Sequence, residues 1–132
     1  MQSSVVYKQS IDLTYETDHT VTIGASAVKK QATYYTGAKG EEQMTYSQSY
    51  ADGAVDKTTL YTYNTSDALS TSVTYKDTDN ERIDALPAAS ALGRKTQEAF
   101  YTGAQGEELM SYSTEWTGVK TEETIKTTTI YT

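Results

Sequence analysis

The sequence predicts an all-β protein built from antiparallel hairpins, and three observations support this fold class. The first is composition, because 12 Tyr, one Trp and abundant Thr favour pleated, half-buried strands. The second is the alternation of apolar and polar residues in stretches such as 44–50. The third is a phrase that occurs twice, YYTGAKGEEQMTYSQSY at 34–50 and FYTGAQGEELMSYSTEW at 100–116.

The repeated phrase belongs to a longer internal match. Upstream of it, SVVYK at 4–8 resembles SVTYK at 72–76, and downstream TTLYT at 58–62 resembles TTIYT at 128–132. A match at a constant interval is typical of tandem arrays, here with units of about 66 residues.

We therefore predict two tandem repeat units, 1–66 and 67–132, packed as one continuous β structure. Antiparallel hairpins of this kind would form an elongated sheet, a spiral or a sandwich. The length of 132 residues suits one domain or two very small ones.

The strands are expected where apolar and polar residues alternate with a period of two. This pattern covers 7–15, 44–50, 69–75 and 110–116. The segment 83–93 breaks the pattern and contains the only proline, so a short helix or a crossing loop is expected there.

Turn residues separate the strands. The equivalent segments 36–41 and 102–107 are predicted to be hairpin turns, because glycine supplies the positive φ angles that tight turns require. The structural turn glycines are Gly37, Gly40, Gly103 and Gly106.

Four aromatic residues at equivalent positions, Tyr46, Tyr50, Tyr112 and Trp116, share one predicted face of the strands. We expect them to be largely buried and to pack on one another, since aromatic pairs across strands stabilise sheets. The alternative is a row of exposed rings on which sugars stack.

The stretch YTYNTSDALSTSVTY at 61–75 resembles the tyrosine–aspartate (YD, or RHS) repeats of bacterial cell-surface proteins and toxin shells. Tyr63 and Asn64 stand where that family has Tyr-Asp, and Asp67 stands where it has a turn glycine. The family's Asp and its usual Gly-Arg are absent from every copy. The resemblance implies an extracellular, non-enzymatic spiral of hairpins.

Composition argues against several function classes. The net charge of −7 repels nucleic acid, and the absence of cysteine excludes disulfides and thiolate chemistry. No apolar run approaches the ~20 residues of a membrane span, so no membrane insertion is expected.

No catalytic motif is recognised, so we expect neither enzymatic activity nor a cofactor. The one histidine, His19, cannot build a zinc site alone. The acidic segment 77–84 is a weak candidate for calcium, although a solvated turn is the simpler interpretation. Its carboxylates are Asp77, Asp79, Glu81 and Asp84.

The last predicted strand, 124–132, has a single charged residue, Lys126, and is rich in β-branched residues. Unprotected edge strands of this kind pair with other strands. We expect Thr128, Ile130 and Tyr131 to form an assembly edge that meets the SVVYK segment of another copy, head to tail.

These observations predict a structural, self-assembling extracellular repeat protein, a building block of a surface fibre, filament or sheath whose partners are copies of itself. The first alternative is a carbohydrate-binding adhesion module that recognises a cell-wall or surface glycan through exposed Tyr and Trp. The second alternative is a segment of a shell that encloses a toxin.

Overall fold

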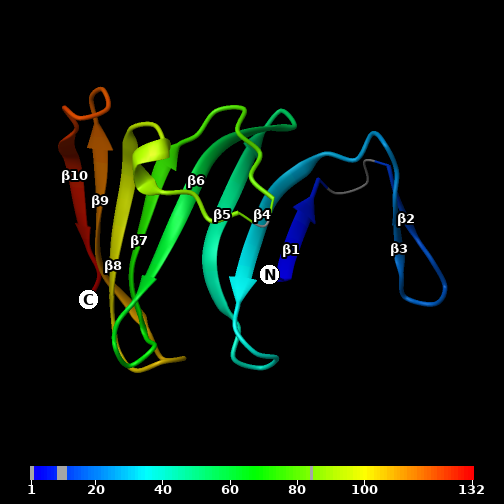
Figure 1. Ribbon diagram of the computed structural model, residues 1–132, viewed down its shortest axis with the longest axis horizontal. Coiled ribbons are helices and arrows are strands. Elements are labelled where there is room, and N and C mark those ends of the chain that lie inside the picture. The colour runs from blue at the N-terminus through cyan, green and yellow to red at the C-terminus, as the bar shows by residue number, and fades with distance from the viewer. Residues whose placement is uncertain (1, 9–11, 84) are drawn as a thin grey trace.

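A computed structural model describes residues 2–8, 12–83 and 85–132 (Figure 1). Within these ranges eight strands form one antiparallel sheet, two form a separate hairpin, and one 3-10 turn occurs at Ala89–Ala91. The predicted all-β class is confirmed. The large sheet contains β1 (Gln2–Tyr7), β4 (Lys29–Thr36), β5 (Gln43–Ala51), β6 (Ala54–Tyr63), β7 (Leu69–Lys76), β8 (Lys95–Thr102), β9 (Leu109–Thr117) and β10 (Thr124–Ile130), and the hairpin contains β2 (Leu13–Tyr15) and β3 (Val21–Ile23).

The large sheet is a meander that runs from one edge to the other. Its order is β1-β4-β5-β6-β7-β8-β9-β10, so strands that follow one another along the chain are neighbours except where the β2–β3 hairpin intervenes. The hairpin projects beyond β1 (Figure 1). In the described chain, β1 and β10 therefore form opposite edges of one open sheet.

The turns β4–β5 and β8–β9 are closed by the glycines that the sequence predicts. Gly37 has a φ of 117° and Gly40 a φ of 87°, and their equivalents Gly103 and Gly106 have φ angles of 121° and 82°, so this prediction is confirmed. A Cβ atom on Gly37 would lie 2.6 Å from the carbonyl oxygen of Glu41, a distance that no side chain tolerates.

The second glutamate of the repeated GEE sequence also closes the turn. The carboxylate of Glu42 accepts a 2.8 Å hydrogen bond from the N–H of Gly40, and Glu108 accepts the same bond from Gly106. The repeated phrase thus encodes a turn with its own side-chain cap.

Strand register recurs along the sheet. Tyr34 lies opposite Tyr46, Phe100 lies opposite Tyr112, and an irregularity follows both pairs at the next residue. The rings stack in both pairs, with centroids 4.5 Å and 4.4 Å apart. The boundary between the two predicted repeat units stays a prediction, since the sheet runs through it without a break.

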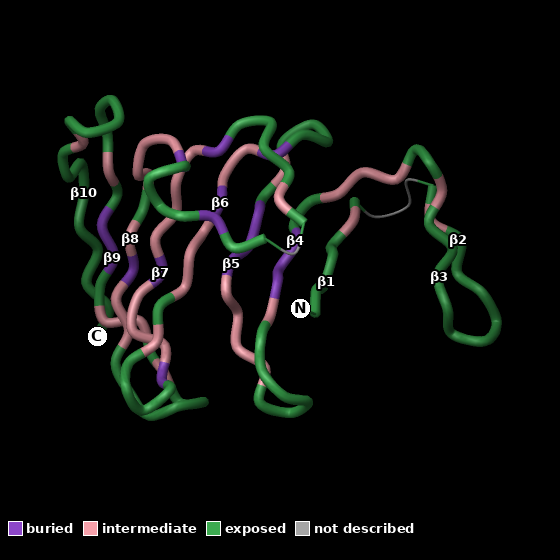
Figure 2. The backbone as a smooth tube through the Cα atoms, in the orientation of Figure 1, coloured by how far each residue is buried: buried purple, intermediate pink, exposed green. Residues whose placement is uncertain are grey.

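The best-buried region lies in the first half of the sheet, where the connection 77–94 crosses one face (Figures 1 and 2). Figure 2 shows buried segments along the central strands, whereas β10 and nearly all of β1 are exposed. The expected crossing loop is therefore present, with one 3-10 turn in it. The buried cluster comprises Ala32, Tyr34 and Tyr46, with Tyr50 and Leu60 packed against it.

The expected strand over 7–15 is wrong as a continuous element. β1 ends at Tyr7, Lys8 and Asp12 lie outside the strands, and β2 begins at Leu13. Asp12 has a φ of 52°, and its carboxylate accepts a 2.7 Å hydrogen bond from the N–H of Ser26. This bond joins residues on either side of the β2–β3 hairpin and closes its base.

Candidate functional site

The pairing of β6 with β7, together with the connection 77–94 that follows β7, forms what we call the internal junction. In it Leu60 lies opposite Val73, and Thr59 lies opposite Thr74 with their hydroxyl oxygens 2.8 Å apart. The junction joins the first half of the sheet to the second, so it shows how this chain extends a sheet beyond β6.

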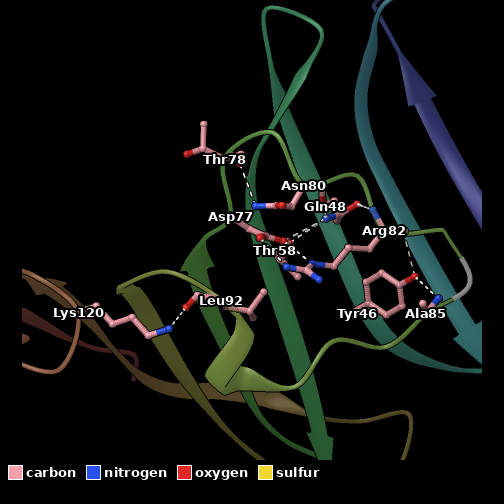
Figure 3. A network of polar contacts seen from close by, with 10 residues as sticks. All are labelled: Tyr46, Gln48, Thr58, Asp77, Thr78, Asn80, Arg82, Ala85, Leu92 and Lys120. Atoms are coloured by element: carbon pink, nitrogen blue, oxygen red, sulfur yellow. Dashed lines mark hydrogen bonds and ion pairs between the residues drawn. The ribbon is translucent and has the colours of Figure 1, made fainter.

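A buried ion pair fixes the connection over the sheet (Figure 3). The Asp77 side chain is 1% exposed and accepts hydrogen bonds from Nε and Nη2 of Arg82 at 2.8 Å and 2.9 Å. The hydroxyl of Thr58 on β6 donates to Asp77 at 2.6 Å. Burial alone raises the pKa of Asp77, but the bonds from Arg82 and Thr58 outweigh it and hold the pKa below its ordinary value.

Gln48 on β5 connects the same segment to the next strand. Its amide nitrogen donates to the carbonyl oxygen of Asn80 at 2.8 Å and to the hydroxyl of Thr58 at 3.0 Å. Its amide oxygen accepts a 2.9 Å bond from the N–H of Arg82. A fully buried glutamine is stable here because its polar atoms have partners.

Tyr46 supplies a third attachment point (Figure 3). It is fully buried, and its hydroxyl donates to the carbonyl oxygen of Arg82 at 3.1 Å and accepts from the N–H of Ala85 at 3.1 Å. The aromatic ring therefore belongs to the sheet core, while its hydroxyl holds the connection in place.

Glu81 extends the attachment to β4. Its carboxylate lies 2.7 Å from Nζ of Lys29 and accepts a 3.1 Å bond from the hydroxyl of Tyr50. The bond to Lys29 holds the pKa of Glu81 below its ordinary value, and burial followed by the bond to Glu81 raises the pKa of Tyr50. The connection thus reaches across three strands of the preceding half.

The predicted assembly residues lie at the free edge of the sheet. Thr128 and Ile130 belong to β10, whose residues are all exposed, and Tyr131 directly follows it. Ile130 is 74% exposed. The N–H of Tyr131 donates to the carbonyl oxygen of Ser111, which keeps the end of the chain aligned with β9.

The expected burial of the four aromatic residues is correct for Tyr46 and wrong for Tyr112. Tyr50 and Trp116 are half-buried, and Tyr112 is 37% exposed although it stacks on Phe100. The cause is the covering layer, because the connection that covers Tyr46 has no counterpart over Tyr112 in the described chain.

The structure does not bring the calcium candidates together. Asp77 pairs with Arg82 and Glu81 with Lys29, while Asp79 is exposed with a φ of 63°, and Asp84 lies outside the described residues. In the described ranges no group of three or more His, Cys, Asp or Glu side chains is placed to hold a metal ion.

Sequence reasoning missed the polar network under the connection. The only signal was the charged segment that contains both Asp77 and Arg82, and this segment gave no indication of its target on the sheet. Gln48 gave no indication of the network either, because alternation predicts that its side chain is buried but not which residues it contacts.

Among the described residues, none of the helical structure is long and apolar enough to cross a membrane. The resemblance to tyrosine–aspartate repeats stays a prediction. Comparison of the chain with family models, with curated proteins and with solved structures found no match.

Proposed function

We propose that this chain is a structural, self-assembling protein whose copies join head to tail into a fibre, filament or sheath outside the cell. The observation that best supports the proposal is that the two edge strands, β1 and β10, pair with their neighbours as the two strands of the internal junction, β7 and β6, pair with theirs. β10 pairs with β9 in the register that β6 has with β5, and β1 pairs with β4 in the register that β7 has with β8. The extracellular location rests on the resemblance to tyrosine–aspartate repeats.

The internal junction supplies the register of the proposed contact. Leu60 corresponds to Ile130 and Val73 corresponds to Val5, so Ile130 of one copy would face Val5 of the next. By the same reasoning, Thr128 would face Tyr7 as Thr58 faces Tyr75. Backbone hydrogen bonds provide the affinity in strand addition of this kind.

The geometry of the edges favours an open chain of copies over a closed dimer. The two edges are formed by different strands, β1 and β10, at opposite ends of the strand order, so a contact between them is heterologous. β10 lacks the usual protection of an edge, since it has one charged residue, Lys126, and no proline. Each added copy would expose a new β10 for the next.

A proline in β10 tests the proposal. The N–H of Tyr131 points toward β9, where it donates to Ser111. Because successive N–H groups along a strand point in opposite directions, the N–H of Thr128 points away from β9, to the free edge. Thr128→Pro should therefore keep the ladder to β9 and remove an N–H needed by the next copy. We expect sedimentation at micromolar concentration to show oligomers for the wild type and for Thr128→Val, and monomers for Thr128→Pro. A wild type that stays monomeric overturns the proposal.

A charge reversal tests the register independently. In the internal junction, Asp56 lies 2.7 Å from Nζ of Lys76, and the equivalent residues at the free edges are Lys126 and Lys8. These two lysines would repel one another, so salt should strengthen the association of the wild type. Lys126→Asp should tighten the association at low salt. Weaker association of Lys126→Asp would contradict this register.

A second candidate function is glycan binding, which the exposure of Tyr112 and the half-exposure of Trp116 favour. Aromatic rings at a surface can stack on sugars. The monomeric Thr128→Pro variant separates the two functions, because its Tyr112 face is uncovered. Quenching of Trp116 fluorescence by soluble polysaccharide would support glycan binding, and unchanged fluorescence would leave assembly as the better account.

A further inference from the structure

Two connections occupy equivalent places in the sheet. The connection 77–94 joins β7 to β8, and the connection 8–28, which contains the β2–β3 hairpin, joins β1 to β4. The first covers the face of the preceding strands through contacts to Tyr46, Gln48 and Lys29. In the described residues no strand precedes β1, and the hairpin of the second connection stands beyond β1 (Figure 1).

The hairpin and β1 enclose an apolar groove of about 460 Å³. Val5 lies opposite the buried Ala32, so the groove opens on the face of the sheet that the connection 77–94 covers further along. Ile23 at its rim is 52% exposed. The lining residues are Val5, Tyr7, Leu13, Tyr15, Val21 and Ile23.

The opposite end of the sheet offers a surface that matches this groove. Tyr112 is equivalent to Tyr46, and Ile130 lies opposite Tyr112 as Leu60 lies opposite Tyr46. Tyr46 is covered and Leu60 packs against its cluster, whereas Tyr112 and Ile130 are exposed. No hydrogen bond to the Tyr112 hydroxyl is found within the described chain, in contrast to the two that hold Tyr46.

Exposed apolar side chains are concentrated at these two ends. Apart from Ile83 and Leu86, every large apolar side chain that is exposed in the described residues lies in β1 to β3 or from β9 onward. Exposed apolar surface gathered in this way indicates a contact between proteins. Here the two patches lie at opposite ends of one sheet, as a head-to-tail contact between copies requires.

We infer that the β2–β3 hairpin is a clasp that closes over β9 and β10 of a second copy, with Ile130 and the ring of Tyr112 seated in the apolar groove. The inference rests on the proposed function for the pairing of β10 with β1. That pairing places Ile130 beside Val5, which lines the groove. The hairpin then covers Tyr112 as the connection 77–94 covers Tyr46.

The chemistry of the clasp differs from that of the internal junction. Gln48, which binds the connection through its amide, is replaced at the equivalent position by Thr114, and the hairpin side of the groove is lined by Leu13, Tyr15, Val21 and Ile23. The contact between copies is therefore apolar where the internal one is polar. An apolar contact can open and close without leaving buried charges unpaired.

Substitutions in the hairpin separate the clasp from strand pairing. Val21→Ser combined with Ile23→Ser removes apolar surface from the groove and leaves β1 and β10 intact. We expect the dissociation constant for self-association, measured by sedimentation, to rise about tenfold or more, because roughly 1.4 kcal/mol of apolar burial is lost. The matched control is Thr22→Ser, at the position between the two, which should leave the constant unchanged.

A cross-linking experiment gives a second readout, since the chain has no cysteine of its own. Chains with Ile23→Cys are mixed with chains with Tyr112→Cys and oxidised, and a covalent heterodimer is expected. Leu109→Cys, at the first residue of the same strand β9, is the control and should not cross-link.

The outcomes distinguish the two proposals. A wild type that does not associate overturns the proposed function and the clasp together. If the wild type associates but the double serine variant binds equally well, or if Leu109→Cys cross-links as readily as Tyr112→Cys, the clasp is wrong while strand pairing stands.

Discussion

Removing the hydroxyl of Tyr46 should loosen the connection 77–94 without disturbing the sheet beneath it. Tyr46→Phe keeps the ring stacked on Tyr34 and deletes two hydrogen bonds of 3.1 Å, one to the carbonyl oxygen of Arg82 and one from the N–H of Ala85. A hydrogen bond contributes about 0.5–1.5 kcal/mol net, so the free energy of unfolding should fall by about 2 kcal/mol. Tyr46 is 0% exposed, so water cannot replace the lost hydroxyl.

The matched control is Tyr112→Phe. Tyr112 also stacks on an aromatic ring, that of Phe100, but Tyr112 is an exposed residue, so its hydroxyl should contribute less than about 0.5 kcal/mol. Both variants are made in the monomeric Thr128→Pro background, and unfolding in urea is followed by circular dichroism. Hydrogen exchange at the N–H of Ala85 should accelerate in Tyr46→Phe alone. Equal losses at the two positions, or no loss at Tyr46, would refute the reasoning.

Two further outcomes are expected. Gly37→Ala should lower the free energy of unfolding by roughly 2 kcal/mol in the same urea assay, and Gly40→Ala should lower it by about 1 kcal/mol. Both glycines have positive φ angles, but only Gly37 faces a carbonyl oxygen, that of Glu41. Similar losses at the two positions would contradict this explanation. The folded-state pKa of Asp77 lies below its ordinary value of 3.8, so its stabilisation is present above pH 3.8 and is lost as the pH falls through the folded-state pKa. Asp77→Asn should remove that part of the acid dependence, and an unchanged acid transition would show that Asp77 does not contribute to it.

The turns could be predicted from the sequence because their requirement is local. Gly37 and Gly103 recur at equivalent places, and a glycine is the residue that a positive φ beside a neighbouring carbonyl demands. Three strands of the meander, β5, β7 and β9, followed from alternation for the same reason, since pleating imposes its period on a short stretch of chain.

The remaining features depend on contacts between distant residues. Tyr46 and Tyr112 have similar neighbours in sequence, yet a segment roughly 35–40 positions further along the chain covers only the first. The residues of 7–15 alternate, but β2 pairs with β3 in a separate hairpin, whose base is closed by the bond from the N–H of Ser26 to Asp12. Gln48 could not be assigned to Asp77 and Asn80 without the path of the connection.

The meander also determines how the protein would respond to tension. Hydrogen bonds in an antiparallel ladder lie perpendicular to the strands, and the two edges of this sheet lie at opposite ends of that perpendicular direction. A force applied between the two edges therefore acts along the hydrogen bonds of each ladder. It breaks them one pair after another (unzipping) and does not load all of them at once, as shear would. The connection 77–94 is bound to Lys29 on β4 and to Tyr46 and Gln48 on β5, so it holds these strands together. Extension should therefore begin in the strands that the connection does not cover. A fibre of such sheets would yield strand by strand.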